Sequence, residues 1–231
     1  MPSRDELQLR DHASFVNDAL HASADNPING VKGVSPLLFL PLFDIVSGFV
    51  PDYLHCALLG VACTFAGLWF DSSNHEKPWY AGQSGVSAIS RNLVTLRPPS
   101  DISRLPRSLS ERKFWKGSEW KSFLLYYSLL ILPGHLAAKY LNHWFLLVYA
   151  IHILLQETVD RDVFLAENVL LEFVSGVPAL YGLEYCTFNV RQLLHLPAAI
   201  FNWGPLWAFS CFRFEGSISC PLWSVLCGPR C

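Results

Sequence analysis

The sequence lacks the short motifs that mark common nucleotide-binding and hydrolytic enzymes. None of GxxxxGK[ST], GxGxxG, HExxH or GxSxG occurs in its 231 residues, which leaves phosphate-loop and common hydrolase functions without support. Charged residues are also scarce, at 16%, and the net charge of −2 by itself indicates no polyanionic partner. Because 52% of the residues are hydrophobic, the composition is typical of a folded chain with a large core and excludes general disorder.

The sequence has no CxxC pair, although it contains an odd number of cysteines. They are Cys56, Cys63, Cys186, Cys211, Cys220, Cys227 and Cys231. The charged N-terminal stretch MPSRDELQLRD is no signal peptide, so we expect free thiols and a nuclear or cytoplasmic location. Without a second close Cys/His pair, buried thiols are favoured over a zinc site around His55, Cys56 and Cys63.

Three uncharged runs raise the alternative of a multi-span membrane protein. They cover residues 53–70, 122–138 and 140–156, and the mean hydropathy is +0.28. Each run is interrupted. The first contains His55, the second Pro133-Gly134, and the third Asn142, His143 and His152. We therefore expect buried helices of a globular protein and no membrane partner.

Apolar periodicity predicts a mostly α chain. Residues 1–30 read as a polar, partly helical lead-in ending in the turn DNPING, and 33–51 favour extended segments and turns. Helices are expected over 53–70, 86–97, 136–156, about 158–176 and 188–203. A further helix is expected to follow a serine cap at Ser108 or Ser110 and to end before Pro133-Gly134.

Asp52 and His55 stand out because they lie three residues apart in the apolar stretch VPDYLHCALLGV. On a helix this spacing places both side chains on one face. The pair therefore fits a ligand pair, an acid/base pair, a helix cap beside a satisfied histidine, or an unrelated surface pair.

A basic strip, defined here as the Lys and Arg residues from 91 to 121, concentrates positive charge. It contains Arg91, Arg97, Arg104, Arg107, Arg112, Lys113, Lys116 and Lys121, with only Asp101, Glu111 and Glu119 as acids. One interpretation has these cations contacting phosphates while Trp115 and Trp120 stack or pack. The other has the charges solvating the outer face of a helix whose Phe114, Trp115 and Phe123 face the core.

Three segments in order resemble the transposase domain of CACTA-type (En/Spm-like) DNA transposons and host genes derived from it. They are FDIVSGFVPDYLHCALLGV, PRSLSERKFWKGSEWKSFLLYYSLLIL and NVRQLLHLPAAIFNWGPLWAFSCFRFE. The resemblance covers roughly residues 30–215. It implies the helical insertion and C-terminal part of a ribonuclease-H-like catalytic domain, with an incomplete sheet. In such enzymes three carboxylates hold two Mg²⁺ or Mn²⁺ ions for phosphoryl transfer.

The resemblance also implies roles for particular residues. Asp52 and His55 match the family's Asp-x-x-His motif, and Glu215 matches the third, metal-binding acid. These three are the candidate catalytic residues, with Asp52 fixing the ring tautomer of His55 or both residues stabilising the fold beside the site. The candidate nucleic-acid-binding residues are Arg97, Arg104, Arg107, Arg112, Lys113 and Lys116.

The chain departs from the family pattern at its start and its end. The two aspartates that precede the Asp-x-x-His motif have no counterpart, since Asp44 fits neither, and Arg191 stands where the family usually has His. We therefore expect a lead-in over 1–30, a transposase-like fragment over 31–215 and a divergent cysteine-rich tail over 216–231. This fragment is expected to need no cofactor and to be catalytically inactive, with DNA or a second copy as partner. A domesticated DNA-associated binding protein is the alternative.

Overall fold

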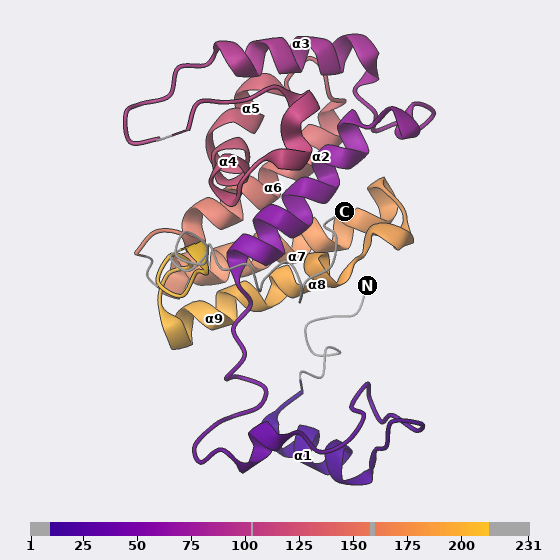
Figure 1. Cartoon of the computed structure of the whole chain (residues 1–231), viewed down its shortest axis with the longest axis vertical. Coiled ribbons are helices and arrows are strands. Elements are labelled where there is room, and N and C mark those ends of the chain that lie inside the picture. The colour runs from indigo at the N-terminus through magenta and orange to yellow at the C-terminus, as the bar shows by residue number, and fades with distance from the viewer. Residues whose placement is uncertain (1–9, 103, 158–159, 213–231) are drawn as a thin grey trace. The chain divides into compact units, whose positions relative to one another are not determined.

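The computed structural model describes residues 10–102, 104–157 and 160–212 (Figure 1). Most of these residues lie in helices and none lies in a strand, since Ile28 and Val31 form only an isolated bridge. The mostly α prediction is therefore confirmed. The chain divides into two compact units, Met1–Val50 and Pro51–Cys231, whereas the sequence suggested a boundary near residue 30.

The first unit contains one α-helix followed by turns. Helix α1 (His12–His21) begins with a reciprocal cap, in which Asp11 accepts the amide of Ser14 at 2.7 Å and the Ser14 hydroxyl accepts the amide of Asp11 at 3.1 Å. This arrangement satisfies two amides that a helix start leaves without partners. The predicted turn lies at the Ile28–Val31 bridge. The 3₁₀ helix η2 (Pro36–Phe39) follows it.

The second unit begins with a helical rod made of η3 (Leu54–Ala62) and α2 (Cys63–Phe70), which run on as one element in Figure 1. The helix predicted over 53–70 is thus confirmed in position, but η3 is a π-helix. Leu54, Ala57 and Leu58 are completely buried, and the rod contacts both α4 and α8. A sequence that is apolar on nearly every side cannot distinguish 3.6 residues per turn from the wider π turn.

Short helices follow the rod. Their bounds are η4 (Ser72–Asn74), α3 (Gly82–Thr95), η5 (Leu109–Phe114), α4 (Gly117–Ser122), η6 (Phe123–Tyr127) and α5 (Ser128–Ile131). The predicted serine cap is Ser108, whose hydroxyl accepts the amide of Ser110 at 3.2 Å at the start of η5. The single helix expected up to residue 132 is interrupted at Trp115 and Lys116, and η6 within it is a second π-helix.

Helices α6 (Ala138–Leu154) and α7 (Asp160–Leu180) form the most extensive helix pair. The prediction that α7 stops at Gly176 is wrong, because the helix continues through Pro178 to Leu180. A Cβ atom on Gly176 would lie 2.9 Å from Cδ2 of His143. The glycine therefore allows α6 and α7 to approach closely and does not end the helix.

The helix predicted over 188–203 is present but divided. It consists of α8 (Phe188–Gln192), a 3₁₀ turn η8 (Leu193–His195) and α9 (Leu196–Trp203), preceded by η7 (Leu183–Tyr185). After α9 the amide of Leu206 donates to the carbonyl of Leu154 at 3.0 Å. This bond ties the C-terminal part of the described chain to the end of α6.

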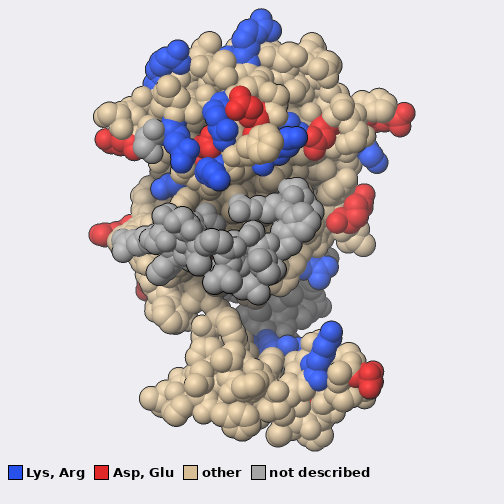
Figure 2. Space-filling model, viewed as in Figure 1, with Lys and Arg blue, Asp and Glu red and all other residues tan. Residues whose placement is uncertain are grey.

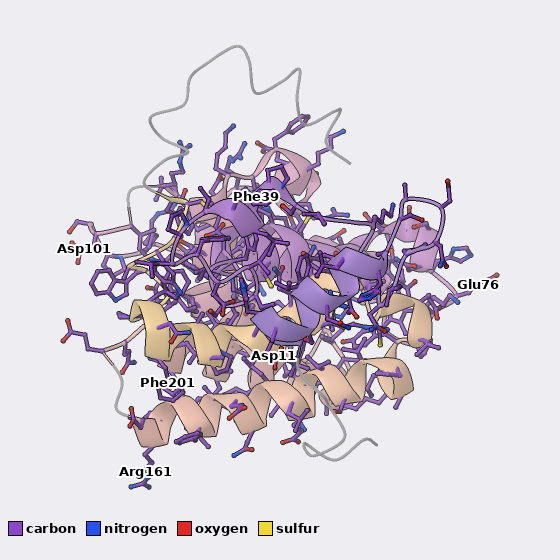
Figure 3. All side chains as sticks on the ribbon, turned by 90° about the horizontal axis from the view of Figure 1, so that it is seen from below. Asp11, Phe39, Glu76, Asp101, Arg161 and Phe201 are labelled. Atoms are coloured by element: carbon purple, nitrogen blue, oxygen red, sulfur yellow. The ribbon has the colours of Figure 1, made fainter. Side chains whose placement is uncertain are left out.

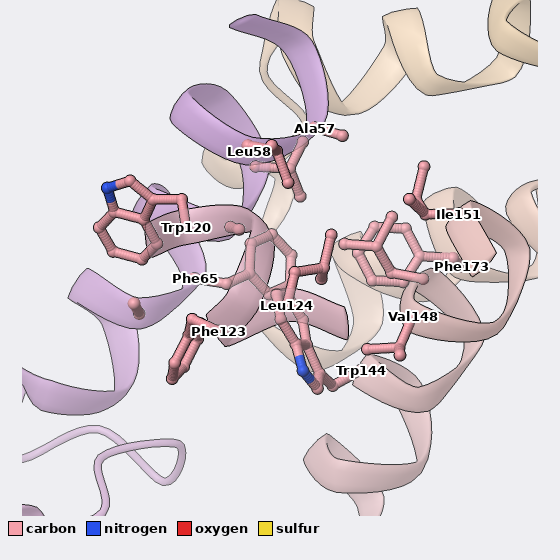
Figure 4. Close-up of a cluster of buried hydrophobic side chains, with 14 of the residues drawn as sticks. Ala57, Leu58, Phe65, Trp120, Phe123, Leu124, Trp144, Val148, Ile151 and Phe173 are labelled. Carbon is pink, nitrogen blue, oxygen red and sulfur yellow. The ribbon is translucent and has the colours of Figure 1, made fainter. Parts of the chain in front are cut away.

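The core of the second unit is built around aromatic side chains from distant segments (Figure 4). The ring of Phe65 lies 5.5 Å from that of Phe173 and 4.9 Å from that of Tyr181, and the rings of Trp69 and Trp144 meet edge to face at 4.8 Å. Such pairs contribute about 0.5–1.5 kcal/mol each beyond their buried area. Helices α2, α6 and α7 are therefore held in one packed core without a sheet among the described residues.

Candidate functional site

Asp52 and His55 contact each other at the start of the rod. Oδ2 of Asp52 lies 2.6 Å from Nδ1 of His55 and also accepts the backbone amide of His55 at 3.1 Å. Because a carboxylate only accepts, the ring nitrogen Nδ1 carries the proton of this bond. The carboxylate thus acts as a helix cap and holds one tautomer of the imidazole, whose side chain is 50% exposed.

Cys211, near the end of the described residues, joins this pair. Its backbone amide donates to Oδ1 of Asp52 at 2.9 Å, so both carboxylate oxygens of Asp52 are used. One ligand atom from each of Asp52, His55 and Cys211 lies within 4.8 Å of the others. We call these three residues the Asp-His-Cys cluster. Sequence reasoning missed Cys211, because nothing local signals a contact across 159 positions.

The donor atoms of the Asp-His-Cys cluster do not fit a two-Mg²⁺ centre. Hard divalent ions of that kind take oxygen ligands, whereas the cluster has one carboxylate, one imidazole and one thiol. Throughout residues 10–102, 104–157 and 160–212 it is the one group of three or more candidate ligands that converge. Glu215, the residue matched to the third acid, lies outside the described residues.

Burial makes the residues next to the cluster poor acids. The thiol of Cys56 is buried and donates to the carbonyl of Asn189 at 3.3 Å, and burial, assisted by the charge of Asp52, raises its pKa to about 12. Burial likewise raises the pKa of Tyr53 above its ordinary value of 10.0. Both groups therefore stay protonated at neutral pH.

In the basic strip, Arg107 is committed to contacts inside the protein. Its guanidinium donates to both carboxylate oxygens of Glu119, from Nε at 2.6 Å and from Nη2 at 2.9 Å, and also to the carbonyl of Phe114 at 2.8 Å. Burial favours the neutral acid, but the bonds from Arg107 and the Lys116 amide outweigh it and lower the pKa of Glu119. Arg107 therefore links the end of η5 to α4 through these bonds. The sequence did not indicate this role.

Two further arginines of the strip also bind within the protein. Arg112 forms an ion pair with Asp71 and donates to the carbonyl of Leu109 at 3.0 Å. Arg97 donates to the carbonyls of Val94 and Leu96, both at 3.0 Å, and so satisfies oxygen atoms at the end of α3. These contacts hold the loops of the strip in place.

Arg91, Arg104, Lys113 and Lys116 are exposed members of the strip. Figure 2 shows Lys and Arg side chains gathered across the upper part of the face in view, where Figure 1 places α3, α4 and α5. Eight cations against three acids leave an excess of five positive charges between residues 91 and 121. A hollow of about 390 Å³, lined by Arg97, Pro99, Tyr126 and Leu130 among others, adjoins the end of α3.

The tryptophans of the strip are core residues. Trp115 and Trp120 are 7% and 2% exposed, and their rings lie 4.9 Å apart. Neither ring is presented to solvent as a platform for base stacking, whereas Phe114 is 63% exposed with the Lys113 ammonium 5.1 Å from its ring centre. Of the three aromatic residues expected to face the core, Trp115 and Phe123 are buried and Phe114 is exposed. Trp120 is buried as well.

Comparison of the chain with protein-family models, with curated proteins and with solved structures finds no match.

One described helix, α7, is long and apolar enough to cross a membrane, with a mean hydropathy of 1.5 over its most apolar window. It is not one of the three runs that the sequence suggested. Val163, Leu170 and Phe173 of α7 are buried in the core, and 28% of its most apolar window is buried in total. Core helices of water-soluble proteins pass the same test of length and composition. One such helix is weak evidence for a membrane span.

Proposed function

We propose that this chain is a non-catalytic helical domain derived from a CACTA-type transposase, and that it contacts the phosphate backbone of nucleic acid through its basic strip. The observation that carries the proposal is that some cations of the strip form ion pairs within the protein while others are exposed to solvent. Arg107 and Arg112 form internal ion pairs, while Arg104, Lys113 and Lys116 are exposed. Fixed loops that present unburied cations suit electrostatic contact with phosphates.

The proposed contact is independent of base sequence. Trp115 and Trp120 pack in the core. Helices α3 and α4 carry only one cation of the strip each, Arg91 and Lys121, so neither described helix presents a row of cations to a groove. Affinity would then come from counterion release, which depends strongly on salt. The donor set of the Asp-His-Cys cluster supports the non-catalytic part of the proposal, because among the described residues it offers one carboxylate where two-metal chemistry needs several.

Binding of a labelled DNA duplex to the full chain, measured at 50–200 mM salt, tests the proposal. The variant Arg104→Gln/Lys113→Gln/Lys116→Gln should lower the affinity at least tenfold. It should also reduce the slope of log affinity against log salt by roughly 2–3, because each lost phosphate contact removes about 0.9.

The matched control removes three exposed cations from elsewhere, in Lys77→Gln/Lys139→Gln/Arg161→Gln; Figure 3 shows Arg161 pointing outward at the start of α7. The control should bind almost as tightly as the natural chain. Equal losses in the two triple variants, or an affinity independent of salt, would refute the assignment of the strip. Mg²⁺- or Mn²⁺-dependent DNA nicking that Glu215→Ala abolishes would refute the non-catalytic part.

A further inference from the structure

The Asp-His-Cys cluster brings together two segments from opposite ends of the second unit. Asp52 and His55 lie at the start of the rod, and Cys211 follows α9. Their ligand atoms all lie within 4.8 Å of one another. Sequence proximity does not explain this convergence, because Cys211 lies 159 positions from Asp52 in the chain.

The backbone around the cluster is held in place by other contacts. The Cys211 amide donates to Oδ1 of Asp52 at 2.9 Å, and the ring of Tyr53 lies 5.8 Å from that of Phe212. Tyr53 is 1% exposed, so this ring contact anchors the neighbour of Cys211 to the core. A site with its backbone already positioned loses little conformational entropy when a ligand binds.

The donor set selects the class of metal ion. A thiolate, an imidazole nitrogen and a carboxylate oxygen are the ligands of Zn²⁺, and a thiolate disfavours Mg²⁺ and Ca²⁺. Zinc-to-ligand bonds of about 2.0–2.3 Å in a tetrahedron place ligand atoms roughly 3.3–3.7 Å apart. The 2.6 Å contact between Asp52 and His55 would open, and distances up to 4.8 Å would close. Each change is about one ångström and is within reach of side-chain rotation.

We propose that Asp52, His55 and Cys211 bind one Zn²⁺ ion. Binding requires the Cys211 thiol to lose its proton and the Nδ1 proton of His55 to move to Nε2, so metal uptake liberates the thiol proton. The ion joins the start of the rod to the segment after α9 and stabilises the folded chain by mass action. This inference concerns structure and does not rest on the proposed contact with nucleic acid.

Titration of the reduced, metal-free full chain with Zn²⁺, and with Co²⁺ as a spectroscopic probe, tests the proposal. We expect one equivalent of Co²⁺ to produce visible bands of tetrahedral coordination and a near-ultraviolet thiolate-to-metal band. Cys211→Ser should abolish the thiolate band, and His55→Ala should weaken Zn²⁺ affinity at least tenfold. His55 has a half-exposed side chain, so His55→Ala tests the site without disturbing the core.

Two controls remove other thiols. Cys63→Ser and Cys186→Ser should bind Co²⁺ and Zn²⁺ as the natural chain does, because these cysteines lie outside the cluster. Loss of binding in Cys220→Ser/Cys227→Ser/Cys231→Ser, together with unchanged binding in Cys211→Ser, would overturn the proposal by placing the ion elsewhere. Absence of stoichiometric binding to the natural chain would also overturn it.

Discussion

The carboxylate of Glu119 accepts two bonds from one guanidinium, with Arg107 Nε 2.6 Å from Oε1 and Nη2 2.9 Å from Oε2. The Glu119 side chain is only 7% exposed, whereas that of Arg107 is 35% exposed. The pair is therefore shielded on the acid side and open to solvent on the cation side. It fixes the turn between η5 and α4, which includes the exposed Lys116 and follows the exposed Lys113.

Glu119→Gln should destabilise the fold by about 1–3 kcal/mol at pH 7, because it removes a charge-assisted pair and leaves Arg107 with a weaker acceptor. Since the folded pKa of Glu119 lies below 4.5, its contribution is present above pH 4.5 and is lost as pH falls through the folded pKa. Urea denaturation of the natural chain and the variant from pH 3 to 7 measures this difference. Glu111→Gln is the control, since that side chain is 51% exposed and lies 3.4 Å from Arg107; an equal loss there would contradict the prediction.

His143 should make the fold sensitive to mild acid. Its Nε2 bonds to the carbonyl of Phe173 at 2.7 Å and its ring stacks on that of Phe173 at 4.3 Å. Burial is the largest cause that lowers its pKa below 6.5, so the unfolded chain binds the proton more readily. Stability should therefore decrease as pH falls below about 6.5.

His143→Gln tests this dependence, because a side-chain amide can still donate to the Phe173 carbonyl but does not titrate. Denaturation at pH 5 and 7.5 should show a smaller loss of stability on acidification in the variant than in the natural chain. His152→Gln, at an exposed position on the same helix, should keep the dependence of the natural chain. Identical pH profiles for all three proteins would contradict the role given to His143.

Ser128 links α5 to α6 inside the core. Its hydroxyl accepts the indole N–H of Trp144 at 2.9 Å and donates to the carbonyl of Leu124 at 3.0 Å. Ser128→Ala leaves the buried indole N–H without this acceptor and should cost about 1–3 kcal/mol. Ser87→Ala is a matched control, because its hydroxyl makes the same type of bond, to Gln83 at 2.9 Å, on an exposed surface. Denaturation followed by tryptophan fluorescence should show a change within about 0.5 kcal/mol for that control.

Gly117 lies where the rod and α4 approach each other. A Cβ atom there would overlap Cδ1 of Leu54, which is completely buried. Gly117→Ala should therefore destabilise the fold by about 1–3 kcal/mol. At Gly85, inside α3, a Cβ atom would meet its nearest neighbour at 3.7 Å, so Gly85→Ala should stabilise the fold by about 0.4–1 kcal/mol. Thermal unfolding should shift in opposite directions, and equal shifts would show that the close approach has no energetic cost.

The positions of the main helices were predictable because each buries a stripe of apolar residues. Trp144, Val148 and Ile151 recur at helical spacing in α6 and are all buried. The end of α7 was not predictable, because Gly176 reads as a stop signal until His143 is seen packed against it. The same limit applies to the π-helix in the rod, whose apolar residues give no preferred face.

The candidate site also has a part that was predictable from the sequence and a part that was not. The spacing of Asp52 and His55 predicted a shared helix face, and the structure decides that they are in direct contact. Cys211 could not be added, nor could Glu119 be recognised as the partner of Arg107, because those contacts depend on how the segments pack.

By itself the amino-acid sequence determined the helical character of this protein, the excess of positive charge between residues 91 and 121, and the spacing that puts Asp52 and His55 on one helix face. These are local properties, since periodicity, composition and spacing act within a few helical turns. Only the tertiary structure decided which arginines are used internally, which aromatic residues are buried and which thiol meets the Asp52 carboxylate. Those outcomes depend on contacts between segments far apart in the chain, and side-chain packing selects them.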